Sequence, residues 1–217
     1  MVKVRIWDWP TRLFHWGLVL AIVGMVVTGQ TGQMMWHFRL GQAVLALLLF
    51  RLIWGLVGGH WSRFARFAIA PSAVLAYWRG LREGGPGHSP AGALATLGLL
   101  SWLGLQVLSG MMADDEIAFA GPLTAMVPSD WVHRMTAWHK GPGKLVLLGL
   151  VLLHLGAIIW YARRKGQRLT PAMLHGDKHL PAPVPASADG PVQWLLALLV
   201  LGASVAAVRW VFALGGY

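Results

Sequence analysis

The sequence predicts an all-α integral membrane protein, and three observations lead to this prediction. Of the 217 residues, 56% are hydrophobic and only 12% are charged, and the mean hydropathy is +0.58. A soluble domain carries about twice that charged fraction. Several runs approach the roughly 20 apolar residues that cross the hydrocarbon core of a bilayer. Basic residues flank these runs, so the net charge of +10 reflects membrane topology, and no nucleic-acid partner is expected.

The first two predicted spans are joined by a short polar turn. Residues 12–30 and 40–58 are each an apolar run of about the length that a bilayer requires. The turn, residues 29–33, reads Gly-Gln-Thr-Gly-Gln. These two runs predict two consecutive crossings of the membrane.

The third and fourth spans complete a membrane domain over residues 1–180. The third, residues 92–112, follows a long connection that ends in a run of glycine and proline, which break helices. The fourth, residues 143–162, ends at a basic cluster. Residues 181–191 form a linker rich in proline and alanine, and residues 192–217 form a C-terminal transmembrane helix with its span at 192–212.

The basic residues predict the orientation of these spans. With a cytoplasmic N-terminus, the cytoplasmic segments hold twelve of the eighteen lysines and arginines. The opposite side has four basic residues beside four acidic ones. Because cytoplasmic loops carry an excess of lysine and arginine, the N-terminus is expected to be inside.

Four histidines lie in or beside the apolar runs, where a buried imidazole is costly and usually functional. His15 begins the first span near the inner face, and His37 precedes the second span near the outer face. His139 and His154 are fifteen residues apart, a rise of about 22 Å on one helix, which places them at opposite depths. The histidines thus sort into an inner pair, His15 with His154, and an outer pair, His37 with His139.

Two such pairs predict two haem groups. A zinc ion needs about four ligands that converge on one point, whereas a pair from separate helices suits the two axial positions of a haem iron. The chain has no cysteine, which excludes thiolate ligands and covalent haem attachment through cysteine. Any metal chemistry must therefore come from other side chains, and we expect the four histidines to bind iron.

Several neighbouring residues are harder to assign. His133 is the rival of His139, but its separation from His154 is about 31 Å if the chain is helical throughout, which favours His139. Arg51 follows His37 by fourteen residues and returns to nearly the same helix face. It could pair with a haem propionate or extend to the inner interface. His88 lies in a glycine- and proline-rich loop, where a surface or structural role is expected.

Three motifs carry a resemblance to a known family: WDWPTRLFHW at residues 7–16, FRLIWG at 50–55 and GHSPAGA at 87–93. Together with residues 110–115 and 139–154, they resemble the bacterial cytochrome b561 family, which includes the b-type cytochrome subunit of nickel–iron hydrogenases. The resemblance covers roughly residues 4–180. It implies a four-helix bundle in the bacterial inner membrane with two b haems, which transfers electrons between the quinone pool and a redox partner protein. The histidines that match the family's haem-binding positions are His15, His37, His139 and His154.

Other functions and partners stay open at this point. One alternative is a superoxide:quinone oxidoreductase, which needs a quinone pocket near one haem. Another is a non-redox transporter or a structural membrane subunit. The redox partner could be a c-type cytochrome or hydrogenase subunits, and a homodimer is also compatible with the sequence.

Overall fold

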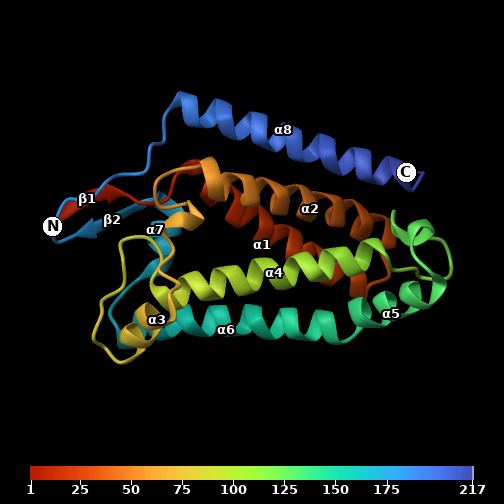
Figure 1. The fold of residues 1–217 in the computed structure, drawn as a ribbon, viewed down its shortest axis with the longest axis horizontal. Coiled ribbons are helices and arrows are strands. Elements are labelled where there is room, and N and C mark those ends of the chain that lie inside the picture. Colours follow the sequence, from red (N-terminus) through yellow and green to blue (C-terminus); the bar gives the residue numbers. More distant parts are fainter. Residues whose placement is uncertain (217) are drawn as a thin grey trace. The chain divides into compact units, whose positions relative to one another are not determined.

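Five long helices dominate the computed structural model, which describes residues 1–216 (Figure 1). They are α1 (Trp9–Gln30), α2 (Met34–Val57), α4 (Pro90–Met111), α6 (Pro142–Arg164) and α8 (Pro191–Leu214). Proline begins three of them, at the first helical position, where its missing N–H group costs nothing. Each is long and apolar enough to cross a membrane, α6 being counted together with the helix before it. The five predicted spans and the all-α membrane fold are confirmed.

Shorter elements connect the long helices. The helical ones are η1 (Phe64–Arg66), α3 (Pro71–Trp78), η2 (Thr124–Met126), α5 (Ser129–Lys140) and α7 (Leu169–His175). Two strands, β1 (Val2–Arg5) and β2 (Asp177–Leu180), pair antiparallel, with Val2 opposite Leu180 and Arg5 opposite Asp177. Figure 1 shows this small sheet beside the N-terminus.

The chain divides into two compact units, and each long helix contributes residues to both. The first unit comprises Met1–His15, Arg51–Gly98 and Leu153–Val200. The second comprises Trp16–Phe50, Leu99–Leu152 and the residues from Leu201 onward.

The core of the second unit is built by four helices. Its buried residues are Ala21 from α1, Val44 and Leu48 from α2, Leu103 from α4 and Leu147 from α6. A separate cluster joins α8 to α2, where Val208 and Phe212 pack with Ala46. Four helices therefore share one core, and the fifth packs against α2 through contacts of its own.

In the first unit, the segment predicted as a linker is bound to the N-terminal strand. Ser187 donates its backbone N–H to the Arg5 carbonyl at 2.8 Å and its hydroxyl to the Ile6 carbonyl at 2.7 Å. The Trp61 indole donates to the Pro185 carbonyl at 2.7 Å. These bonds fix the chain between β2 and α8 to the rest of the unit.

Asp8 is fully buried and fixes the start of α1. Its Oδ1 accepts from the Thr11 backbone N–H at 2.8 Å, as an N-cap residue does, and from the Trp54 indole at 3.2 Å. Its Oδ2 accepts from the Gly59 backbone N–H at 3.1 Å and from the Ser62 hydroxyl at 2.7 Å. A Cβ at Gly59 would lie 2.1 Å from Oδ2, so only glycine permits this approach. The first turn of α1, which leads to His15, is thereby held in place.

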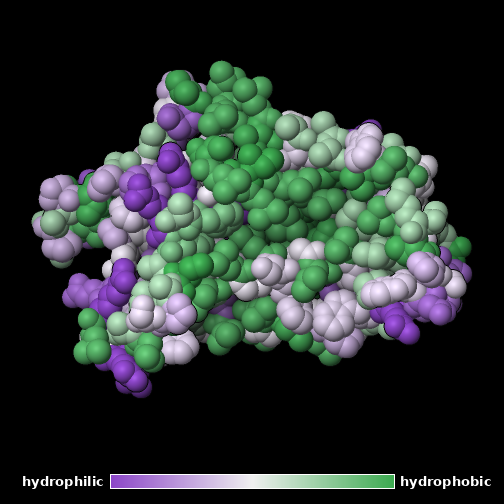
Figure 2. Space-filling view, in the orientation of Figure 1, coloured by the Kyte–Doolittle hydropathy of each residue, from purple (hydrophilic) through white to green (hydrophobic). Residues whose placement is uncertain are grey.

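Hydrophobic side chains remain exposed along the long helices. On the face drawn in Figure 2 they cover the helices, and hydrophilic residues gather over β1 and β2 and over the loop before α5. Leu20, Leu56 and Leu198 are 73%, 71% and 67% exposed. Such surface suits a lipid environment, where apolar side chains face hydrocarbon.

Candidate functional site

His37 and His139 face each other in the second unit. Their ring centres are 6.1 Å apart, and the ring planes are inclined by 86°. Two imidazoles that bind one metal ion from opposite sides, with bonds of about 2 Å, have ring centres roughly 6 Å apart. The separation therefore fits two axial ligands of one iron.

Hydrogen bonds orient both rings. His37 Nδ1 lies 3.0 Å from the Met25 carbonyl, and His139 Nδ1 lies 2.9 Å from the Gln106 carbonyl. Because a carbonyl only accepts, each Nδ1 must carry the proton and donate it. The Nε2 atom of each ring is then the one with a lone pair for a metal, which is the usual arrangement of metal-binding histidines.

Glycines allow close approach to both rings. A Cβ at Gly110 of α4 would lie 2.7 Å from His139 Cε1, and one at Gly29 of α1 would lie 3.2 Å from His37 Cε1. Any larger residue at Gly110 would force the His139 ring to move. These two glycines are part of the site, and sequence reasoning did not single them out for this role.

The expectation that one continuous helix carries His139 and His154 is wrong. His139 lies in the last turn of α5, and α6 begins at Pro142. Gly141 between them has φ −113° and ψ −108°, outside the helical region. The following proline lacks an N–H group and disfavours a helical conformation in the residue before it. The rise of about 22 Å, calculated for an unbroken helix, therefore does not apply.

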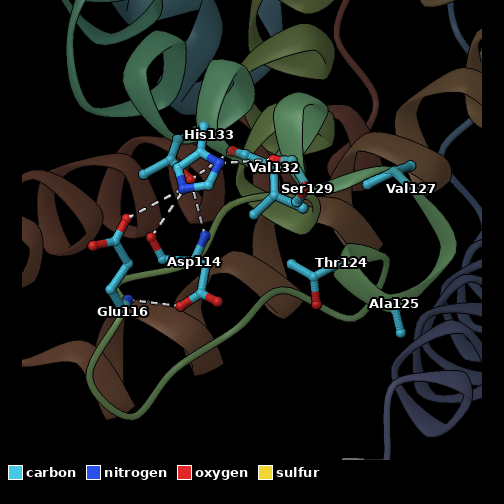
Figure 3. A pocket seen from close by; sticks show the side chains of 9 residues that line it. Asp114, Glu116, Thr124, Ala125, Val127, Ser129, Val132 and His133 are labelled. Atoms are coloured by element: carbon cyan, nitrogen blue, oxygen red, sulfur yellow. Dashed lines mark hydrogen bonds and ion pairs between the residues drawn. The ribbon is translucent and has the colours of Figure 1, made fainter.

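His133 lies in a different environment from His139. Its side chain is 70% exposed, its Nδ1 lies 2.9 Å from the Ser129 carbonyl, and its Nε2 lies 3.8 Å from Glu116 Oε1. It lines a cavity of about 430 Å³ with Asp114, Glu116 and Thr124, among others (Figure 3). His139, and not His133, faces His37.

The inner pair belongs to the first unit. His15 from α1 and His154 from α6 are both half-buried and lie close enough to interact electrostatically. Arg51 from α2 belongs to the same unit and is 3% exposed. Its guanidinium carbon lies 4.5 Å from the centre of the Phe64 ring. The structure thus brings His15, His154 and Arg51 into one unit, and His37 and His139 into the other.

Of the two roles expected for His88, surface or structural, the structure supports the structural one. Its ring centre lies 4.7 Å from that of Trp7 and 4.6 Å from that of Phe67, and its Nδ1 is buried. Burial, with the nearby charges of Arg51 and Lys178, lowers the pKa of His88 to about 3, so the ring is neutral. The sequence feature that could have pointed to a structural role for His88 is its place in the GHSPAGA motif.

The histidine pairs suit a metal whose other ligands come from a cofactor, such as the ring nitrogens of a porphyrin. Within residues 1–216, no group of three or more His, Asp or Glu side chains converges to hold a metal ion. Paired histidines with ordered Nδ1–H donors are what an iron porphyrin requires from the protein.

The sequence pattern of the prokaryotic cytochrome b561 family matches residues 6–176, from just after β1 through α7. No individual curated protein matches the chain. The match spans the four helices that form the shared core, and it leaves out α8. Proteins of this family are four-helix membrane bundles that bind haem b. The chain therefore belongs to the prokaryotic cytochrome b561 family and is a multi-pass membrane b-type cytochrome that transfers electrons.

Proposed function

We propose that the chain holds two b haems and transfers electrons between quinone or quinol and a redox partner protein. His15 and His154 bind one haem, and His37 and His139 bind the other. The observation that supports this most directly is the opposed His37–His139 pair with its ring centres 6.1 Å apart.

The protein residues set the properties of the cofactor. When bound, haem supplies one-electron chemistry through the oxidation state of its iron. With two histidines holding each haem, the iron would have no position left for oxygen, which would favour electron transfer. The Nδ1–H bonds from His37 to Met25 and from His139 to Gln106 fix each ring and increase the basicity of its Nε2.

Arg51 is proposed to bind a propionate of the inner haem. Its side chain is almost fully buried, and its Nη1 has no hydrogen-bond partner among residues 1–216. An unpaired buried charge costs several kcal/mol, on the order of the cost of breaking a buried ion pair. A carboxylate from the cofactor would remove that cost.

The proposed location is the bacterial inner membrane with the N-terminus in the cytoplasm. The excess of basic residues in the segments assigned to that side supports this orientation. Residues 1–180 are proposed as the haem domain, with residues 192–217 as an added transmembrane helix. A c-type cytochrome or hydrogenase subunits are the proposed partners, and a homodimer is compatible with the exposed apolar helices.

Optical spectroscopy of the purified protein tests the proposal. We expect a reduced-minus-oxidised spectrum with a b-type α-band and two haems per chain. His154→Ala and His37→Ala should each remove about half of the haem, because each breaks one pair. His175→Ala, which replaces an exposed histidine, is the matched control and should keep both haems. Absence of the α-band would contradict the haem assignment. Full haem retention in both variants would contradict the proposed histidine pairs.

Quinone chemistry separates the electron-transfer proposal from the superoxide alternative. Quinol should reduce the purified cytochrome without any superoxide source. Quinone reduction that occurs only with superoxide would favour the superoxide:quinone oxidoreductase instead.

A further inference from the structure

The first unit contains a buried arginine with no counter-ion of its own. Arg51 is 3% exposed, and none of the ion pairs among residues 1–216 includes it. The carboxylate that interacts with it electrostatically is Asp8. Both oxygens of Asp8 already accept two hydrogen bonds each, from Thr11, Trp54, Gly59 and Ser62. Arg51 Nη1 therefore has no protein acceptor.

The other carboxylates of this unit near the N-terminal strand are also paired. Asp177 accepts from Arg5 at 2.6 Å and lies 3.2 Å from Lys3. Asp189 accepts from Arg5 at 2.6 Å and from the Trp9 backbone N–H at 3.0 Å. The charge that would neutralise Arg51 is thus expected from outside the polypeptide.

His88 supplies a second buried polar atom without a partner. Its Nδ1 has no hydrogen bond among residues 1–216, and the ring is packed between Trp7 and Phe67. Lys178 fixes the two residues that precede His88. Its Nζ donates to the Pro86 carbonyl at 2.7 Å and to the Gly87 carbonyl at 3.3 Å. The ring is therefore fixed in place rather than mobile in a loop.

A short run of packed rings connects Arg51 to His88. The Arg51 guanidinium carbon lies 4.5 Å from the centre of the Phe64 ring, the Phe64 and Phe67 ring centres are 5.5 Å apart, and those of Phe67 and His88 are 4.6 Å apart. The two residues are also close enough to affect each other electrostatically. A neutral imidazole still carries one N–H donor, and the guanidinium has five. One charged and one neutral donor, both buried and both unpaired, form a site for an anion with planar oxygen atoms. A carboxylate matches the fork geometry of arginine.

We propose that His88 and Arg51 together bind the propionate carboxylate of the haem held by His15 and His154. This inference rests on the proposed function and adds His88 as a cofactor-binding residue. Arg51 supplies the charge, and His88 supplies a donor of fixed direction. His88 does not bind the iron.

Redox titration and resonance Raman spectroscopy of the complete protein test the proposal. In Arg51→Gln, loss of the cation favours the oxidised haem, so the ratio of reduced to oxidised haem at a fixed potential falls about tenfold, which is about 59 mV for a one-electron couple. In His88→Phe, which keeps an aromatic ring between Trp7 and Phe67, the ratio falls about threefold, on the order of one lost hydrogen bond. His88→Gln retains a donor and should stay near the wild type.

The controls separate direct contact from a general loss of charge. The propionate bending bands of the Raman spectrum should move in Arg51→Gln and His88→Phe, and they should stay unchanged in Arg39→Gln, which removes an exposed arginine from the same helix. Only one of the two haems should be affected. If Arg51→Gln does not fold, the comparison of His88→Phe with His88→Gln still tests the contact.

An unchanged potential together with unchanged propionate bands in His88→Phe would overturn the inference. If quinol-driven reduction were also lost in that variant, the pair would be assigned to a quinone instead. Failure of the proposed function is distinguishable, because the wild-type protein would then lack the b-type α-band altogether.

Discussion

Ser62 donates its hydroxyl to Asp8 Oδ2 at 2.7 Å, although the two residues are 54 positions apart. Thr11 Oγ1 lies 2.7 Å from the same hydroxyl oxygen and must be the donor there, because the Ser62 proton goes to Asp8. The chain after α2 is thereby joined to the first turn of α1. His15, the proposed inner haem ligand, lies one turn beyond Thr11, so its position depends on this buried contact.

Asp8→Asn should lower the free energy of unfolding by about 1–3 kcal/mol, the cost of leaving a buried donor unsatisfied. An asparagine has one acceptor oxygen, and its NH2 group would face donors that now bind the second carboxylate oxygen. Thermal unfolding of the purified protein measures the loss. Glu83→Gln, at an exposed position, is the control and should leave stability unchanged.

His139→Ala should remove about half of the haem, whereas His133→Ala should remove none. The reason is that His139 faces His37, and the His133 side chain is 70% exposed beside Glu116. Haem content per chain, measured by pyridine haemochrome assay, decides between them. The reverse result would make His133 the outer ligand.

Gly110→Ala should disturb the outer haem and leave the inner one intact. The added Cβ would lie 2.7 Å from the His139 ring, which must then turn away from His37. Electron paramagnetic resonance of the oxidised protein, which reports the ligand geometry of each haem, should show one altered signal. Gly202→Ala in α8, where a Cβ meets nothing within 4 Å, should leave both signals unchanged.

Acid should loosen the strand pair β1–β2. Burial raises the pKa of Asp177, but hydrogen bonds and charge from Arg5 and Lys3 outweigh it and hold that pKa below its ordinary value. The paired carboxylate thus stabilises the fold at higher pH, and this stabilisation is lost as the pH falls through the lowered pKa. Hydrogen-exchange protection of residues 2–5 should fall below a pH of about 4. Asp177→Asn should show the low protection already at neutral pH, and constant protection in the parent protein down to pH 3 would contradict this account.

The absence of cysteine allows a direct test of orientation. A single cysteine at Gln33, in the exposed turn between α1 and α2, should react with a membrane-impermeant maleimide applied to intact spheroplasts. A single cysteine at Gln167, exposed after α6, should react only after the membrane is permeabilised. The opposite labelling pattern would place the N-terminus outside.

Local patterns were enough to predict the spans, because apolar length alone determines which helices can cross a bilayer. The pairing of His37 with His139 followed from topology. The sheet of β1 and β2 could not be foreseen, since its partners Arg5 and Asp177 are 172 residues apart and each strand has only four residues. For His88 the sequence left a surface and a structural role open, because glycine and proline around it indicate a loop, and a loop sequence does not tell that Trp7 and Phe67 pack against the ring.

The bond from Ser187 to the Ile6 carbonyl joins residues 181 positions apart. At about 5–20 residues per second, a ribosome makes these two residues roughly 10–35 seconds apart. His15, Arg51, His88 and His154 have all been synthesised before Ser187. The N-terminal strand must therefore wait first for β2 and then for Ser187 before all of its native hydrogen bonds can form. During biogenesis there is thus an interval in which all residues proposed to contact the inner haem have been synthesised, but Ser187 has not yet bonded to the N-terminal segment.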